Sequence, residues 1–169
     1  MSRTLYVLCA RSITNTKEVH PLIFHCKFFD ELTTTELYEI AHARTQVFLL
    51  EQKIICQDFD RVDYDALHCF LWEDGKVIAY LRAYLTDGNT VKIGRVLSVT
   101  HGAGLGNKLM FASLAEIKKR WQHARITLHA QTHAKGFYER FGFVVDSEEF
   151  LEEGIPHVEM TYAPAGDAT

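Results

Sequence analysis

The chain has 169 residues, of which 47% are apolar and 24% charged, and its formal net charge is −4. This length is enough for one domain with a buried core that needs no disulfide or structural metal. The acidic balance, without runs of Lys and Arg, argues against a nucleic-acid partner. No stretch has the roughly 18 to 20 apolar residues that a membrane span requires. The apolar run at residues 5–10 is short and lacks a cleavage site, so the sequence predicts a cytoplasmic protein.

The first recognisable elements are a strand and a long helix. Residues 1–22 have no clear periodicity and are assigned to an N-terminal lead of uncertain structure. Residues 23–29 have the pattern of a strand. Thr33 and Glu36 have the spacing of a capping box for a helix that continues to about Glu51.

An acidic and irregular connection follows over residues 54–65. Two interpretations are open: a solvated loop, or a negative surface that favours a cationic substrate. Arg95, in a later predicted strand, is a candidate ion-pair partner for one of these carboxylates. The aspartates in question are Asp58, Asp60, Asp63 and Asp65.

The second half of the chain alternates strands and helices within one domain. Strands are predicted over residues 68–72 and 77–85, because Asp74-Gly75 between them is a strong signal for a two-residue hairpin. The later elements are a strand over 91–99, a helix over 105–121, a strand over 125–130, a short helix near 135–141 and strands near 143–150 and 157–162. No repeat or linker divides them. We therefore assign residues 23–163 to a single domain and 164–169 to a C-terminal tail.

The run from Arg95 to Met110 carries the strongest chemical signal. A β-branched strand pattern breaks into Gly102, Gly104 and Gly106 and then resumes with helical periodicity. Glycines allow backbone conformations closed to other residues, and their N–H groups, with the positive end of the following helix, form an anion site. Taken alone, such a loop also serves tight turns and close helix packing.

The cysteines and histidines form no metal or disulfide pattern. None of the cysteines belongs to a C-x-x-C pair, which is typical of reduced thiols. His129 and His133 are four residues apart, but no third ligand is evident, and we expect no metal. The cysteines are Cys9, Cys26, Cys56 and Cys69.

The order of elements and two motifs resemble the GNAT acetyltransferase superfamily over residues 23–162. The segment from His101 to Gly106 is similar to the family's Arg/Gln-x-x-Gly-x-Gly/Ala pyrophosphate motif, with His101 in place of Arg or Gln. Residues 134–143 (AKGFYERFGF) are similar to its Ala-x-x-Phe/Leu-Tyr-x-x-x-Gly-Phe segment. The chain most resembles the ElaA-type branch, on the evidence of Arg44, Val47, Phe48, Glu51, Gln52, Asp58, Asp60, Asp63, His68, Gly154, Ile155, Pro156 and His157.

The resemblance implies an α+β (α/β) fold of the GNAT acyltransferase type. Its mixed, mostly antiparallel central sheet would be splayed at the cofactor site and flanked by helices. The pantetheine arm of acetyl-CoA would enter between strands 91–99 and 125–130 and pair with exposed backbone, one N–H of which would face the thioester carbonyl. The implied acetyl-CoA contacts are Leu97, Ser98, Val99, His101, Gly102, Ala103, Gly104, Leu105, Gly106, Asn107, Gln131, Phe137 and Tyr138.

The resemblance also implies direct acetyl transfer to a primary amine in a ternary complex. Tyr138 would protonate the departing CoA thiolate, although packing beside neighbouring aromatic rings is an alternative role. A general base is needed because a free amine with a pKa near ~10.4 is mostly protonated at pH 7. His157, His68 and Glu51, in that order, are the candidates, and each also fits a structural hydrogen-bonding role.

Three classes of function remain open at this point. The first is an N-acetyltransferase acting on a small amine, an amino sugar or a protein amine. The second is a non-catalytic acyl-CoA-binding module, against which the presence of Tyr138 counts. The third, a dinucleotide-binding domain, lacks repeated βαβ units and has Asn107 where a third glycine is needed. A homodimer also remains open, because C2 pairs are the commonest assemblies.

Overall fold

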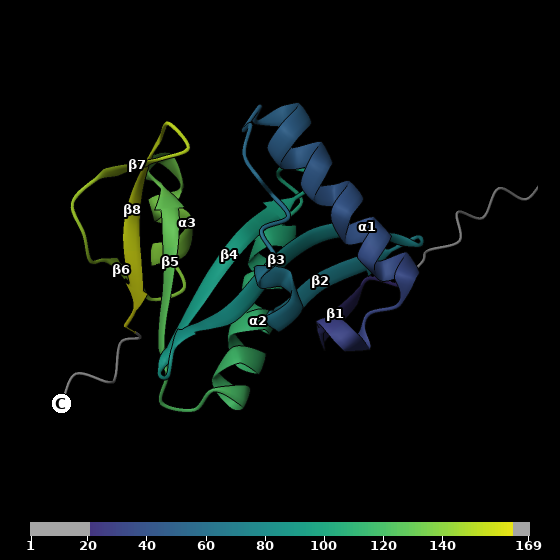
Figure 1. Ribbon diagram of the computed structural model, residues 1–169, viewed down its shortest axis with the longest axis horizontal. Helices are drawn as coiled ribbons and strands as arrows, with labels where there is room; N and C mark the ends of the chain where they lie inside the picture. The colour runs from purple at the N-terminus through teal and green to yellow at the C-terminus, as the bar shows by residue number, and fades with distance from the viewer. Residues whose placement is uncertain (1–20, 164–169) are drawn as a thin grey trace, which may run out of the picture.

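The computed structural model describes residues 21–163, which form one mixed sheet with helices on both faces (Figure 1). The elements are β1 (Ile23–Phe28), η1 (Phe29–Glu31), α1 (Thr34–Arg44), η2 (Thr45–Glu51), η3 (Val62–Asp65), β2 (Leu67–Glu73), β3 (Lys76–Asp87), β4 (Thr90–Ser98), α2 (Leu105–Arg120), β5 (Arg125–Gln131), η4 (Thr132–Ala134), α3 (Lys135–Glu139), β6 (Phe143–Val145), β7 (Phe150–Glu152) and β8 (Ile155–Tyr162). The expected lead at residues 1–22, apart from its last two residues, and the expected tail at 164–169 lie outside the described residues.

The sheet has the order β1-β2-β3-β4-β5-β8-β6, and β7 pairs with β8 beside this path. Only β4 and β5 run parallel among these described pairs, and the other neighbours are antiparallel. The predicted GNAT-type, mostly antiparallel sheet is therefore confirmed.

Local signals in the sequence explain two of the elements closely. Thr33 and Glu36 form the predicted capping box, in which Thr33 Oγ1 accepts from the Glu36 N–H at 3.2 Å and Glu36 Oε2 accepts from the Thr33 N–H at 2.9 Å. Asp74 and Gly75 have φ values of 53° and 75°, so the β2–β3 hairpin has the two left-handed residues of a type I′ turn.

The C-terminal strands differ from the sequence prediction. One strand was expected near residues 143–150, but β6 and β7 are separate and pair with opposite ends of β8. The polar residues 146–149 interrupt them, and Glu153 with Gly154 closes a tight turn from β7 to β8, both at positive φ. The β7–β8 hairpin lies next to β5, on the side of the sheet away from β1 (Figure 1).

Two apolar cores hold the central strands from opposite faces. On one face, α2 buries Leu109, Met110, Leu114 and Ile117 against β2 to β5. On the other face, α1 and η2 pack onto β2, β3 and β4, with the buried residues Ile40, Ala43, Val47, Phe70, Tyr80 and Leu97. Apolar burial contributes a stabilising free energy of about 25 cal/mol for each Å² of surface removed from water. Burial on both faces therefore holds in place the strands on which the site is built.

The strands β4 and β5 separate halfway along their length. Their parallel pairing begins at Thr90 with Arg125 and ends at Ile93 with Leu128, although both strands continue. Arg95, at φ 55°, lies in a bulge that shifts the β3–β4 register. A bulge bends its strand, so the expected splay is present and begins immediately after Ile93.

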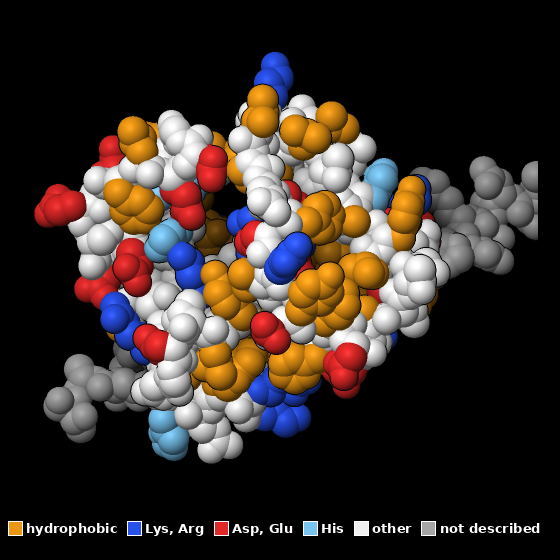
Figure 2. Space-filling model, viewed as in Figure 1, with side chains coloured by type: hydrophobic (Ala, Val, Ile, Leu, Met, Phe, Trp, Pro, Cys, Tyr) orange, Lys and Arg blue, Asp and Glu red, His pale blue; other side chains and the backbone are white. Residues whose placement is uncertain are grey.

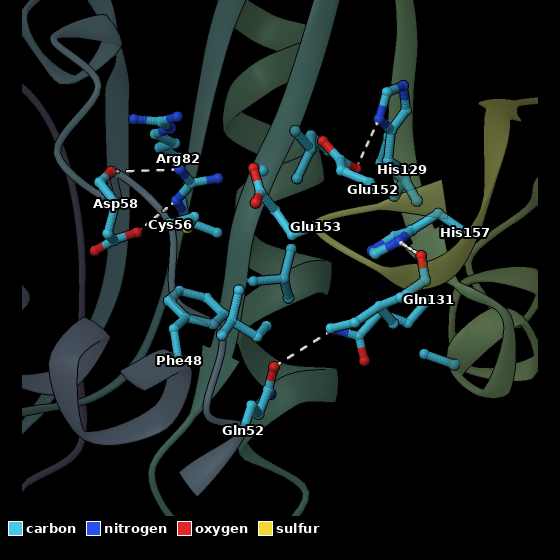
Figure 3. Close-up of a pocket in the computed structure, with 18 of the residues that line it drawn as sticks. Phe48, Gln52, Cys56, Asp58, Arg82, His129, Gln131, Glu152, Glu153 and His157 are labelled. Atoms are coloured by element: carbon cyan, nitrogen blue, oxygen red, sulfur yellow. Dashed lines mark hydrogen bonds and ion pairs between the residues drawn. The ribbon is translucent and has the colours of Figure 1, made fainter. Parts of the chain in front are cut away.

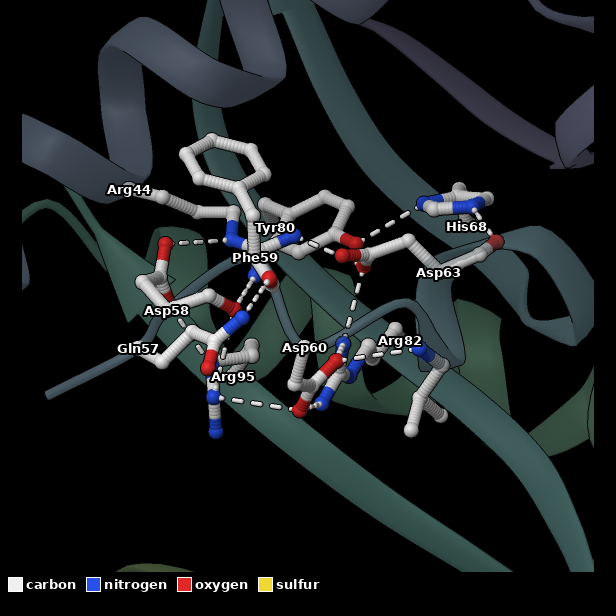
Figure 4. A network of polar contacts seen from close by, with 11 residues as sticks. Arg44, Gln57, Asp58, Phe59, Asp60, Asp63, His68, Tyr80, Arg82 and Arg95 are labelled. Carbon is white, nitrogen blue, oxygen red and sulfur yellow. Dashed lines mark hydrogen bonds and ion pairs between the residues drawn. The ribbon is translucent and has the colours of Figure 1, made fainter.

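A network of three arginines and three aspartates lies beside this bulge (Figure 4). Arg44, which is 1% exposed, donates from Nε to Asp58 Oδ2 at 2.9 Å and from Nη1 to Asp63 Oδ1 at 2.7 Å. Its guanidinium also lies 4.8 Å from the centre of the Phe59 ring. The acidic connection is therefore anchored to α1 by a buried cation.

The other two arginines, Arg82 and Arg95, pair with the same aspartates of the acidic connection. Arg82 donates from Nη1 to Asp60 Oδ1 at 2.7 Å and to Asp63 Oδ1 at 2.9 Å. Arg95 donates from Nε to Asp58 Oδ1 at 2.6 Å, so the predicted pairing of Arg95 with this connection is confirmed. At these three aspartates neither interpretation offered by the sequence holds, because their charges are paired within the fold and are neither solvated nor free to attract a cation.

Asp60 gives the stability of the fold a specific pH dependence. Burial by itself would raise the pKa of Asp60, but the hydrogen bonds and charge of Arg82 outweigh it and lower the pKa from 3.8 to about 2. A carboxyl group with a lowered folded-state pKa stabilises the fold above its unfolded pKa and loses that contribution as the pH falls. We predict that the free energy of unfolding, measured in urea, decreases as the pH falls from about 4 to about 2. In the Asp60→Asn variant this pH dependence should be weaker.

Asp65→Asn is the matched control, because Asp65 lies on the same segment with an exposed side chain. An equal flattening of the pH dependence in both variants would contradict the role assigned to Asp60.

Candidate active site

A cleft of about 520 Å³ opens where β4 and β5 separate, and its walls come from β3, β4, β5, β8 and the segment after η2. Figure 2 shows the molecule hollowed on this face, with charged and histidine side chains around the hollow. Figure 3 shows the lining from close by. The polar lining residues include Gln52, Asp58, Asp60, Arg82, Lys92, Arg95, His129, Gln131, Tyr138, Glu152, Glu153 and His157.

The glycine loop ends in an open row of backbone amides. Gly102 and Gly104 have φ values of 77° and 70°, and Gly104 is the N-cap of α2. The first helical amide with a backbone acceptor is that of Lys108, which donates to Gly104 O at 3.2 Å. No described residue accepts a hydrogen bond from the amides of residues 102–107. These donors and the positive end of α2 fit an anionic group such as a pyrophosphate.

The two motifs found in the sequence meet at Gly106. A Cβ atom at this position would lie 3.3 Å from Cε2 of Phe137, so a hydrogen in place of a side chain lets α2 and α3 approach closely. Phe137 and Tyr138 of the second motif are thereby held beside the start of α2. Gly106 thus has a packing role as well as a backbone amide in the loop.

His101 and Glu51 pair with each other at the edge of the loop. His101 Nε2 lies 2.7 Å from Glu51 Oε1, and the two side chains are 73% and 48% exposed. Glu51 is not among the residues that line the cleft. Glu51 therefore links η2 to the glycine loop and lies outside the lining of the cleft.

The end of β4 offers fewer free backbone groups than the sequence indicated. The Val99 amide donates to Ile78 O at 2.9 Å, so it is committed to β3. Successive residues of a strand direct their peptide groups to opposite edges, which turns those of Leu97 toward β3 and those of Ser98 toward the gap with β5. Of these three expected contacts, Ser98 has the backbone that a pantetheine arm can reach.

His157 presents a free nitrogen to the cleft. Its ring is nearly buried, and Nδ1 lies 2.8 Å from the carbonyl oxygen of Ile155. Because a carbonyl only accepts hydrogen bonds, Nδ1 carries the proton and Nε2 carries the lone pair of the neutral ring. Within residues 21–163, Nε2 has no hydrogen-bond partner. This arrangement fits a general base.

Tyr138 also lines this cleft, and its phenol is unpaired among the described residues. Its ring packs against Phe137 and Phe143, with centroids 5.0 and 6.2 Å away. Burial raises the pKa of Tyr138, so the phenol is protonated at neutral pH. Among the described residues its hydroxyl has no hydrogen-bond partner, and it is available to donate a proton to a bound group.

His68 lies away from the cleft, in a structural position. It is 1% exposed, and its Nδ1 and Nε2 lie 2.8 Å from the Tyr80 hydroxyl and 2.9 Å from the Asp63 carbonyl oxygen. Burial lowers the pKa of His68. With both ring nitrogens bonded inside the protein, the structure does not bring His68 to an acceptor amine, and we do not carry it forward as a base.

Gln131 reaches across the cleft from the end of β5. Its Nε2 donates to Gln52 Oε1 at 3.4 Å (Figure 3), a long and weak hydrogen bond that an entering ligand can replace. The side-chain amide offers both a donor and an acceptor to the cofactor arm, as the family resemblance implies.

The sequence did not single out the acidic wall of the cleft. Glu152 and Glu153 line the cleft at the turn between β7 and β8, and Glu152 Oε2 lies 3.0 Å from His129 Nδ1 on β5. The one usable signal was the pair Glu153-Gly154 between two short strands, which marks a turn. Within the described residues, no three His, Cys, Asp or Glu side chains are grouped to hold a metal ion. No helix in that part of the chain is long and apolar enough to cross a membrane.

The splayed sheet, the cleft at the splay and the open amide row before α2 fit an acyl-CoA-dependent acyltransferase of the GNAT type. Comparison with known proteins agrees: the acetyltransferase (GNAT) domain family matches residues 38–164. A UPF0039 protein of Schizosaccharomyces pombe is 38% identical over 143 residues, which cover 82% of this chain and 95% of the relative. ElaA of Escherichia coli is 35% identical over 136 residues, covering 77% and 89%.

Solved structures lead to the same group. The crystal structure of E. coli ElaA aligns with a TM-score of 0.79 over 85% of this chain and all of the relative, at 31% identity. An acyl-CoA N-acyltransferase from Pseudomonas aeruginosa aligns with a TM-score of 0.80 over the same shares, at 39% identity. The chain belongs to the GNAT acetyltransferase family and to its ElaA-type branch.

Proposed function

We propose that this protein is an acetyl-CoA-dependent N-acetyltransferase that transfers the acetyl group to a primary amine by direct attack in a ternary complex. One observation carries the proposal: His157 Nε2 and the Tyr138 hydroxyl, both without protein partners among residues 21–163, line one cleft at the splay of β4 and β5. The similarity to the P. aeruginosa protein, an acyl-CoA N-acyltransferase, supports the same class of reaction.

The chain has groups for each part of the co-substrate. The amides of residues 102–107 would hold the pyrophosphate, with Gly104 allowing the turn. The backbone of Ser98 and the side chain of Gln131 would hold the arm between the strands. Acetyl-CoA supplies an activated thioester, whose carbonyl becomes an oxyanion on attack. A strand N–H directed at that oxygen contributes about 2.7 to 4 kcal/mol when it is preorganised.

Proton transfer would be divided between two sides of the cleft. On the acceptor side, His157 Nε2 takes a proton from the ammonium or from the attacking amine. On the side of the leaving group, Tyr138 donates its phenolic proton to the thiolate. Glu152, Glu153 and His157 line the same cleft, so we expect the acceptor to bind between the acidic β7–β8 hairpin and β4.

The direct test of the function follows CoA thiol release from acetyl-CoA with a panel of amines, polyamines, amino sugars and lysine peptides. We expect release that depends on one class of acceptor and yields its acetylated product by mass spectrometry. Tight CoA binding without transfer to any acceptor would contradict the proposal and favour a non-catalytic acyl-CoA-binding module.

Tyr138→Phe separates proton donation from packing. The phenyl ring retains the contacts with Phe137 and Phe143, so we predict an unchanged melting temperature and an unchanged KM for acetyl-CoA. Because the proton donor is lost, kcat is expected to fall by about 10² to 10⁴. The measurement is steady-state kinetics with the best acceptor, and a kcat close to that of the wild type would rule out the acid role.

His157→Asn removes the proposed general base but keeps the hydrogen bond to the Ile155 carbonyl oxygen. The Asn side-chain amide reaches the position of Nδ1 and can donate to the Ile155 carbonyl, but it has no counterpart of Nε2. We predict that kcat/KM for the amine at neutral pH falls by roughly 10² to 10⁴. The variant should recover part of its activity at high pH, where the amine is already neutral. A pH–rate profile identical to that of the wild type would contradict the assignment.

A further inference from the structure

A second set of reactive side chains lines the cleft, and the proposed transfer to an external amine does not use it. Lys92 of β4, His129 of β5 and Glu152 of β7 come from separate parts of the chain. Lys92 Nζ lies 3.1 Å from His129 Nε2 and 3.3 Å from His129 Nδ1, and His129 Nδ1 lies 3.0 Å from Glu152 Oε2. Figure 3 shows the His129–Glu152 contact at the wall of the cleft.

The Glu152 carboxylate determines which nitrogen of His129 carries the proton. The hydrogen bond from His129 lowers the pKa of Glu152, which is therefore a carboxylate at neutral pH. A carboxylate only accepts, so Nδ1 of His129 carries the proton. Nε2 then carries the lone pair, and Glu152 holds the imidazole in that tautomer. Lys92 Nζ is at similar distances from the two ring nitrogens, so it lies beside the ring, and the lysine side chain has to turn to meet this lone pair.

Lys92 differs from a surface lysine in its surroundings. The side chain is half-buried, and burial lowers the pKa of its amine. No carboxylate of a described residue lies within ion-pair distance of Nζ. An amine without a counter-ion, in contact with an imidazole that a carboxylate orients, is a nucleophile with a base within reach.

Lys92 is also close to the region where an acyl group would lie. It precedes Ile93, the last residue of β4 that pairs with β5, and Ile93 and Gly94 line the same cleft. The acyl-CoA arm is expected along the β4 edge that opens there. The flexible lysine side chain can therefore turn along this edge toward the thioester.

We propose that Lys92 is an internal acyl acceptor, which becomes N-acylated by the acyl-CoA bound in the cleft. This inference rests on the proposed function, since it uses the same thioester. The Lys92 nitrogen bonds to the thioester carbonyl carbon, the carbon–sulfur bond breaks, and His129 Nε2 takes the proton from the nitrogen. The CoA thiolate leaves and is protonated to the thiol. The product is a neutral amide on Lys92, and no oxidant or reductant is needed.

The test incubates the purified full chain with acetyl-CoA and no added amine. Intact mass and peptide mapping should give one acetyl group, on Lys92, at a rate well above that of the exposed Lys76 in the same sample. Lys92→Arg should remove the modification, and wild-type protein unfolded in urea should lose the preference for Lys92. Equal labelling of Lys92 and Lys76 in the folded protein would overturn the proposal.

Two variants test the roles of the neighbours. His129→Gln should slow Lys92 acetylation by about 100-fold and leave Lys76 labelling unchanged, with folding checked by thermal unfolding. Glu152→Gln, a change at a positioning residue, should alter the tautomer of His129 in ¹⁵N imidazole spectra as well as slow the labelling. Lys92 labelling at the wild-type rate in both variants would contradict the arrangement.

The outcomes also distinguish this inference from the function on which it rests. Acetylation of an external amine by a protein whose Lys92 stays unmodified overturns the inference and leaves the proposed function standing. Failure to transfer acetyl to any external amine and to Lys92, with CoA bound, overturns both. Lys92 acetylation without any external acceptor supports the inference and contradicts the proposed transfer to an external amine.

Discussion

The site depends on one feature of the sheet, the end of β4–β5 pairing at Ile93 and Leu128. If the parallel ladder continued, β5 would use the backbone groups of β4 beyond Gly94 and no cleft would form between them. The bulge at Arg95 bends β4 away from that ladder. A left-handed backbone costs a residue other than glycine about 1 to 2 kcal/mol. The ion pair of Arg95 with Asp58 offsets part of this cost and holds the bulge in place.

The same ion pair joins the bulge to a wall of the cleft. Asp58 accepts from both Arg44 and Arg95, so the segment after η2 is fixed to α1 and to β4 together. A buried ion network adds little net stability relative to apolar packing, but removing one partner leaves an uncompensated buried charge, at a cost of roughly 3 to 5 kcal/mol. The network therefore acts mainly on geometry: it keeps Asp58 and Asp60 at the cleft with their charges already paired.

The features that could be predicted from the sequence are those encoded over a few neighbouring residues. The capping box at Thr33, the hairpin at Asp74-Gly75 and the glycine loop before α2 each combine residue types whose geometry is local. The network could not be predicted in detail, because its partners lie 14 to 37 residues apart and any acidic run is compatible with a solvated loop. The sequence ranked His157 before His68 as the base, and the hydrogen-bond partners then placed His68 in the structural network and His157 in the cleft. The alignment of Lys92, His129 and Glu152 depends on a β7–β8 hairpin whose first strand the sequence pattern did not separate from β6.

We expect acyl-CoA to bind along the open edge of β4 with its pyrophosphate on the amides before α2. The most direct measurement is a titration of ¹⁵N-labelled protein with CoA, followed by amide chemical shifts and hydrogen exchange. We predict large shifts and slowed exchange at residues 102–107 and at Ser98, with little change in the distant β1–β2 pair. Saturable binding that leaves the amides of residues 102–107 unaffected would contradict this claim.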